Sequence, residues 1–123
     1  MATVFTQRGE EVVIDLIDGT SSVHLDATNA RIGWGTGAGT ASKSSTALFT
    51  ESTEARATTV VSQPAADKLR WVGTLTANAA KTITNAGLFD AATGGNLIIH
   101  GDHAGVALAA GDKIEYTIEL EQT

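Results

Sequence analysis

The segment His100-Gly101-Asp102-His103 contains residue types that could bind a metal ion. Imidazole nitrogens and carboxylate oxygens are common ligands of zinc and other divalent ions. However, no further ligand lies nearby in the sequence, and the spacing matches no established metal-binding signature. We therefore expect this segment to form a polar turn between two strands, and we expect no metal site.

The glycine-rich stretch from Gly33 to Gly39 suggests a phosphate-binding loop, but the required motifs are missing. The stretch contains neither G-x-G-x-x-G nor G-x-x-x-x-G-K-[ST]. No helical pattern follows it to supply the positive end of a helix dipole. The sequence therefore predicts no nucleotide and no other cofactor.

Serine, histidine and acidic residues are present in number but form no catalytic pattern. No serine lies in a G-x-S-x-G elbow, the turn that presents a nucleophile. The pair Glu10-Glu11 and the pair Glu119 and Glu121 could act as glycosidase carboxylates. The second pair, however, falls on the solvent face of a regular strand. We expect no catalytic residue, and hence a protein that is not an enzyme.

Trp34 lies among glycines rather than in an alternating strand pattern. Its indole either packs on the domain's own core or anchors a subunit contact, because aromatic side chains are enriched at interfaces. With Asp102 and His103 it would also form the platform of a sugar-binding site. The residues that we expect at an interface are apolar side chains of the N-terminal segment and the loops: Val4, Phe5, Trp34, Leu48 and Phe49.

Runs of β-branched and aromatic residues, separated by turn residues, predict an all-β chain. In the strand at residues 112–121, four large apolar residues alternate with polar ones. Because successive side chains of a strand point to opposite faces, we expect one face of this strand to pack in the core and the other to face solvent. A second strand at residues 67–76 places Trp71 in the core.

A hairpin is predicted between residues 82 and 99, because the paired glycines within Asp90 to Asn96 supply positive-φ turn positions. No segment shows a sustained 3.6-residue pattern, so at most one helical turn is expected, within residues 41–54. Further strands are predicted at residues 3–6, 11–17, 23–26 and 56–63. The last of these should end at Pro64, because proline has no backbone N–H to donate. Loops are predicted at residues 31–40, 41–54 and 100–111.

The 123-residue length indicates one domain. We expect residues 1–9 to form an N-terminal arm or edge strand, and residues 10–123 to form a single-domain antiparallel β-sandwich with long loops. A jelly-roll topology and a small barrel both remain open. Much of the apolar content is alanine, which buries little area, so we expect oligomerisation to add stability.

The net charge of −6 argues against nucleic acid as a partner, because the eight basic residues are scattered. No apolar run approaches the roughly 18 residues that cross a bilayer, so no membrane partner is expected. The N-terminus lacks the basic and apolar regions of a signal peptide. The absence of cysteine excludes disulfides and cysteine-ligated metals, and it fits synthesis in a cytoplasm.

Five segments, by their order and spacing, resemble small structural proteins of tailed-bacteriophage virions. They lie between about Ala30 and Leu120 and read G-W-G-T-G-A-G-T-A, L-F-T-E-S-T-E-A-R, V-G-T-L-T, I-T-N-A-G-L-F-D-A-A-T-G-G-N-L and A-G-V-A-L-A-A-G-D-K-I-E-Y-T-I. Such proteins are capsid decoration (cement) proteins or tail-associated proteins. The resemblance implies a β-sandwich that often assembles as a homotrimer, and it carries over no catalytic residue.

From this resemblance we expect a decoration protein on the capsid exterior of the virion, made in the host cytoplasm. Its partner would be the major capsid protein, whose head lattice it would stabilise through many weak contacts. Residues 1–9 would reach a neighbouring subunit. The alternatives are a tail- or fibre-associated adaptor and a carbohydrate-binding receptor module.

Overall fold

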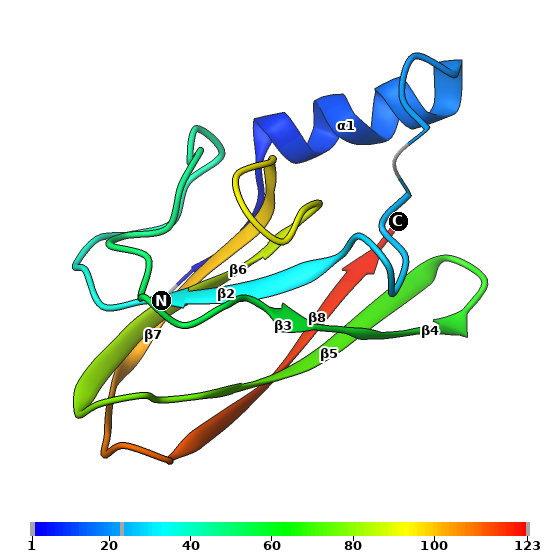
Figure 1. The fold of residues 1–123 in the computed structure, drawn as a ribbon. Coiled ribbons are helices and arrows are strands. Elements are labelled where there is room, and N and C mark those ends of the chain that lie inside the picture. The colour runs from blue at the N-terminus through cyan, green and yellow to red at the C-terminus, as the bar shows by residue number, and fades with distance from the viewer. Residues whose placement is uncertain (1, 23, 123) are drawn as a thin grey trace.

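The computed structural model describes residues 2–22 and 24–122, which fold into two antiparallel sheets packed together (Figure 1). The smaller sheet has the order β4 (Val60–Ala65), β5 (Lys68–Thr76) and β8 (Lys113–Glu121). The larger sheet has the order β1 (Thr3–Phe5), β7 (Leu97–Leu108), β6 (Lys81–Phe89), β2 (Arg31–Gly35) and β3 (Ala57–Thr58). The prediction of an antiparallel β-sandwich is confirmed, while the jelly-roll arrangement stays a prediction.

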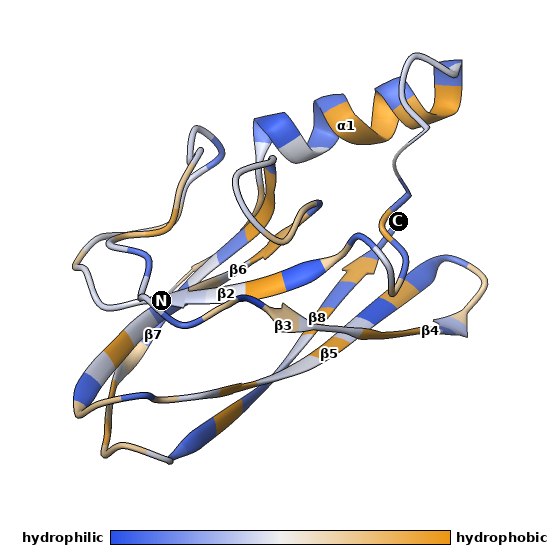
Figure 2. Ribbon diagram, in the orientation of Figure 1, coloured by the Kyte–Doolittle hydropathy of each residue, from blue (hydrophilic) through white to orange (hydrophobic). Residues whose placement is uncertain are grey.

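The core lies between the two sheets. Ile32, Ile83 and Leu88 of the larger sheet are fully buried, as is Trp71 of the smaller sheet. Hydrophobic residues recur along the strands of both sheets (Figure 2), as the period of two requires. The indole N–H of Trp71 donates a hydrogen bond to the Leu25 carbonyl at 2.9 Å. The core placement predicted for Trp71 is confirmed.

The predicted hairpin is confirmed as β6 and β7. Its turn uses positive φ angles of 60° at Gly94 and 72° at Gly95, which glycine adopts without steric cost. The Asp90 carboxylate accepts hydrogen bonds from the backbone N–H of Asn96 at 2.7 Å and from its side-chain amide at 2.8 Å. This carboxylate ties the two ends of the turn together and so fixes the strand register.

The predicted polar turn at His100 to His103 is wrong, and so is the predicted loop at residues 100–111 except for residues 109–111, which lie in a turn. The strand β7 continues through both to Leu108, because β6 pairs with it from Phe89↔Leu97 to Lys81↔Leu108. The small residues of this stretch weaken its intrinsic strand preference. A complete neighbouring strand nevertheless supplies the hydrogen bonds that keep it extended.

Residues 7–18 form the helix α1 (Gln7–Asp18), so the predicted strand at residues 11–17 is wrong. The Thr6 hydroxyl caps the helix by accepting from the Gly9 N–H at 2.9 Å. Gly19 ends it in the left-handed conformation, with φ of 83°. The alternation of V-V-I-D-L-I fits a strand, but a cap at each end favours the helix.

The first turns of α1 pack on β7 because residue 9 is glycine. A Cβ atom at Gly9 would lie 2.4 Å from the Ile98 carbonyl oxygen, so a larger residue would push the helix off the sheet. The Thr6 hydroxyl also donates to the Leu97 carbonyl at 2.7 Å. Val12, one turn further along, is buried against the core. The helix is therefore attached mainly by its N-terminal half, and Leu16 adds a further contact with the core in its second half.

Three other local predictions are also wrong. Residues 31–35 of the expected loop form β2, because β6 pairs along the whole strand and outweighs the weak strand preference of its glycines, while β3 pairs with Arg31 and Ile32. Pro64 lies within β4, an edge strand with a register shift at this point, where proline's missing donor costs little. Residues 24–26 form no strand, and Val23 lies outside the described residues.

Replacing the Trp71 side chain should test the core directly. Trp71→Ala should lower the free energy of unfolding by about 3–5 kcal/mol, because the side chain is 0% exposed and its removal leaves a large cavity. Urea titration followed by circular dichroism measures the loss. The control Val60→Ala, at a residue that is 72% exposed, should change stability by no more than about 0.5 kcal/mol. Equal losses in both variants would contradict the assigned core.

Candidate interaction surface

The residue types that suggested a metal site do not converge. His100 is buried, whereas His103 lies on the partly exposed continuation of β7. The Nδ1–H of His103 donates to the Ala104 carbonyl at 2.8 Å, and its Nε2 accepts from the Tyr116 hydroxyl at 2.9 Å. Within residues 2–22 and 24–122, no three metal-ligating side chains form a group.

His100 belongs to a buried polar network with Asn85 and the backbone of Phe49. Its Nε2–H donates to the Asn85 side-chain oxygen at 3.1 Å, and that oxygen also accepts from the Phe49 N–H at 3.0 Å. The Asn85 amide donates to the Phe49 carbonyl at 3.1 Å. Burial lowers the pKa of His100, which keeps the ring neutral. The Asn85 side chain thus bonds both the N–H and the C=O of Phe49, as the backbone of a neighbouring strand does in a sheet.

Asp102 fastens two distant segments to β7. Its Oδ1 accepts hydrogen bonds from the Ala41 N–H at 2.9 Å and from the Ala2 N–H at 3.1 Å. The Ala41 hydrogen bond is the main cause that lowers the pKa of this carboxyl, against a smaller opposing effect of burial. Asp102 therefore has a structural role in joining the N-terminal segment and the loop after β2 to the larger sheet.

Glu54, near the end of the segment between β2 and β3, is the centre of a second buried polar cluster. Its carboxylate accepts from the Trp34 indole at 3.1 Å, from Lys81 Nζ at 2.5 Å and from the Asn78 N–H at 3.0 Å. Burial alone would raise the pKa of Glu54, but the hydrogen bonds from Lys81, Ser52 and Asn78 outweigh burial and hold the pKa well below its usual range. The ion pair is therefore charged at neutral pH.

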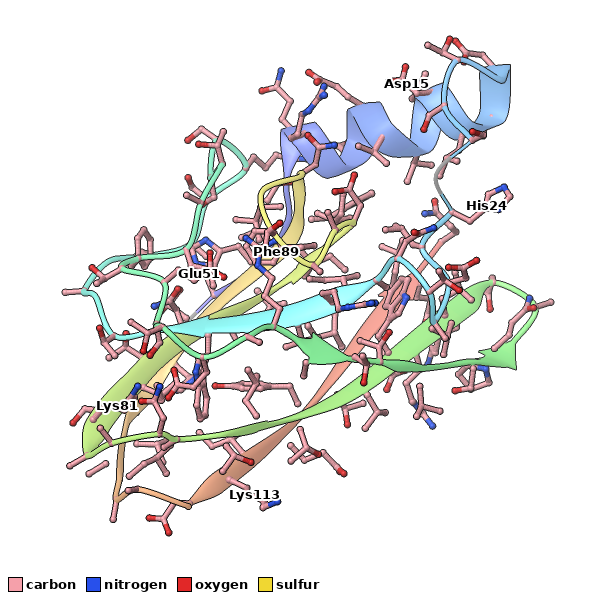
Figure 3. All side chains as sticks on the ribbon, in the orientation of Figure 1. Asp15, His24, Glu51, Lys81, Phe89 and Lys113 are labelled. Carbon is pink, nitrogen blue, oxygen red and sulfur yellow. The ribbon has the colours of Figure 1, made fainter. Side chains whose placement is uncertain are left out.

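Arg56 joins this segment to the turn between β6 and β7. Its guanidinium makes a bidentate pair with Glu51, at 2.8 and 3.0 Å. It also donates to the carbonyls of Ala91 at 3.0 Å and Gly94 at 2.8 Å. The guanidinium carbon lies 3.4 Å from the centre of the Phe89 ring, and Figure 3 shows Glu51 and Phe89 close together there. Arg56 thus has a structural role.

The five residues predicted at an interface fall in different environments. Trp34, 1% exposed, and Leu48, 6% exposed, lie inside the chain's own fold. Val4 and Phe5 in β1, and Phe49 in the loop, are half-buried. The Phe49 ring packs against His100, with 4.7 Å between ring centres. Because the Trp34 ring is buried, the sugar platform of Trp34, Asp102 and His103 is not assembled at the surface.

Two large exposed apolar side chains lie close together on α1, which projects beyond the two sheets (Figure 1). Ile14 is 59% exposed and Ile17 is 77% exposed. Figure 2 shows hydrophobic bands along this helix. Exposed apolar area of this kind marks contact surfaces more often than isolated exposed residues do. The charged residues of α1 are mostly acidic: Arg8, Glu10, Glu11, Asp15 and Asp18.

An apolar groove of about 540 Å³ lies between α1 and the smaller sheet. Val13 and Leu16 of α1 form one wall, and Leu69 and Trp71 of β5 form the other. Figure 3 places His24 below α1, at the end of the molecule where Asp15 also lies. We call Ile14, Ile17 and this groove the α1 surface. Its remaining lining residues are His24, Leu25, Asp26, Val61, Gln63, Ala66, Asp67, Lys68, Leu120 and Gln122.

Sequence reasoning missed the α1 surface because it read the helix as a strand. As a strand, residues 12, 14 and 16 would face the core together. As a helix, Val12 faces the sheet, whereas Ile14 faces outward. The signals that could have identified the helix are the capping threonine at position 6 and the glycine at position 19.

No known protein family, curated protein or solved structure matches this chain. In the part of the chain that the structure describes, no helix is long and apolar enough to cross a membrane.

Neutralising Glu54 should destabilise the fold in a pH-dependent way. Glu54→Gln should cost about 1.5–3 kcal/mol at pH 7, because buried hydrogen bonds to a charged group are lost. Since the folded-state pKa of Glu54 is depressed, this stabilisation is present above the ordinary pKa of 4.5 and declines as the pH falls below it. The difference in unfolding free energy between wild type and variant should therefore shrink between pH 7 and pH 3.

Urea titrations at several pH values measure this difference. Glu11→Gln is the matched control, because the pair of Glu11 with Arg8 is largely exposed. That variant should lose no more than about 1 kcal/mol at pH 7. A Glu54→Gln difference that stays constant with pH would contradict the charged state of the buried pair.

Proposed function

We propose that this chain is a non-enzymatic structural protein of a tailed-phage virion, and specifically a capsid decoration protein that binds the major capsid protein. Two observations support the proposal. The first is the ordered resemblance of residues 30–120 to such virion proteins. The second, which carries it, is the α1 surface, two exposed isoleucines on an amphipathic helix beside an open apolar groove.

The polar groups of the described residues support a structural role rather than a catalytic one. Glu54, Arg56 and Asp102 are each engaged in hydrogen bonds that fasten the loop between β2 and β3 or the chain's N-terminal segment. His100 is held neutral inside the core. A catalytic group needs access to a substrate, whereas these groups are engaged in holding the fold together.

The α1 surface indicates the chemistry of its partner. Burial of Ile14 and Ile17 would contribute most of the binding energy, since each is largely exposed in the free chain. The acidic residues around them would favour a partner surface with basic residues at its rim. Many copies on one lattice would convert a weak contact into firm attachment.

The test is co-sedimentation of the purified chain with phage heads that lack it. Wild type should sediment with the heads. The double variant Ile14→Gln, Ile17→Gln should lose at least tenfold in apparent affinity, because it removes exposed apolar area while keeping good helix formers on α1. Unchanged circular dichroism would verify that the variant folds.

Val60→Thr is the matched control, because Val60 is an equally exposed apolar residue on the smaller sheet, away from α1. It should bind as wild type does. Failure of wild type to sediment with heads would reject the capsid role, and binding to purified tails instead would favour the adaptor alternative. Binding that survives in the double variant would reject the α1 surface as the contact.

A further inference from the structure

The strand β8 has one unpaired edge. Its nine residues pair with β5 from Lys113↔Thr76 to Glu121↔Lys68, and no other described strand lies beside it in the smaller sheet. Its outer N–H and C=O groups therefore have no partner strand. An open edge of this length can serve as a template for another strand, provided that its charged side chains find suitable partners.

The inward face of β8 is incompletely covered. Ile114, Tyr116, Ile118 and Leu120 pack against the core, yet each stays half-exposed, unlike the fully buried Trp71 of the neighbouring strand. The side chains of a further strand beside β8 would pack against the open side of this row. The row is itself apolar, so a suitable neighbour would be another apolar strand face.

The outward face of β8 carries charges that restrict which strand can pair with it. It presents one basic and three acidic residues around a central threonine: Lys113, Glu115, Thr117, Glu119 and Glu121. Glu119 and Glu121 already lie near Lys68 of β5 in the same copy. Glu115 faces the uncharged Thr74 instead, so a glutamate opposite Glu115 would be especially unfavourable.

These charges fit a second copy of β8 in one antiparallel register. When the two-fold axis passes through Tyr116, Lys113 of each copy lies opposite Glu119 of the other. Glu115 then lies opposite Thr117, and no glutamate faces another directly. The inward row also matches itself, because the Tyr116 side chains meet at the axis. Opposite charges directly across a strand pair stabilise it, and like charges destabilise it.

The other registers that keep at least five residues of each β8 paired all oppose glutamates. An axis through Glu115 sets Glu115 against itself, and an axis through Thr117 sets Glu115 against Glu119. An axis through Ile118 sets Glu115 against Glu121, and one through Glu119 sets that residue against itself. Among the five registers compared, only the one centred on Tyr116 avoids placing one glutamate opposite another.

We propose that the chain forms a two-fold homodimer through antiparallel pairing of two β8 strands centred on Tyr116. The two smaller sheets would then join into one continuous sheet of the order β4-β5-β8-β8-β5-β4. The inference is independent of the capsid role, because it uses only the edge, the apolar row and the charges of β8. It differs from the homotrimer that the resemblance implies, so solution mass separates the two.

Light scattering and native mass spectrometry of the full chain should give twice the 12.6 kDa chain mass. Lys113→Glu should raise the dimer dissociation constant by about tenfold or more, because two attractive pairs become repulsive. Adding Glu119→Lys to that variant should restore the dimer. The control Glu121→Gln, whose residue lies outside the paired charges, should behave as wild type.

Cysteine pairing tests the register itself, since the chain has no cysteine of its own. Glu115→Cys and Thr117→Cys are exposed substitutions whose positions face each other in the proposed register. An oxidised mixture of the two variants should give a disulfide-linked heterodimer, whereas neither variant alone should cross-link. Cross-linking of Glu115→Cys alone or Thr117→Cys alone would reveal a different axis and overturn the proposal. A chain that is monomeric or trimeric at several hundred micromolar would also overturn it.

Discussion

Buried polar bonds hold the long segment between β2 and β3 on the sandwich, and much of the remaining structure depends on them. This segment contributes few large apolar side chains, so burial of its own surface cannot fix its position. Asn85, Glu54 and Arg56 supply the missing attachment through hydrogen bonds to backbone and to charged partners. Each is costly to leave unpaired in a low-dielectric interior, which makes the arrangement specific as well as stable.

The parts of the fold that could be predicted from the sequence are those where pattern and turn chemistry agree. The period of two in residues 113–121 and 68–76 places their apolar rows, and neighbouring pairing keeps both strands extended. The paired glycines at 94 and 95 mark the hairpin turn for a steric reason. In these segments, local preference and tertiary structure favour the same conformation, so the strands and the turn could be predicted from the sequence alone.

The remaining parts depend on contacts that no local pattern contains. The run from Val12 to Ile17 alternates like a strand, but the helix is decided by its two caps and by the close approach of Gly9 to β7. The glycines of β2 are held extended by pairing with β6, while β3 pairs with the preceding residues Arg31 and Ile32. The α1 surface was missed because the alternation of residues 12–17 outweighed the cap signals at Thr6 and Gly19, and only the helical geometry turns Ile14 and Ile17 outward.

The attachment of α1 by its first turns has a mechanical consequence. Gly9 rests on the Ile98 carbonyl, while the groove leaves open volume beneath the far half of the helix. Gly9 and Ile17 are eight residues apart, or roughly 12 Å along the axis at the helical rise. A tilt of about 10° around Gly9 would thus move Ile17 by about 2 Å, and it would also shift Leu16 where that side chain packs against the core. The position of Ile17 therefore depends on how firmly the first turns of α1 and Leu16 hold the helix.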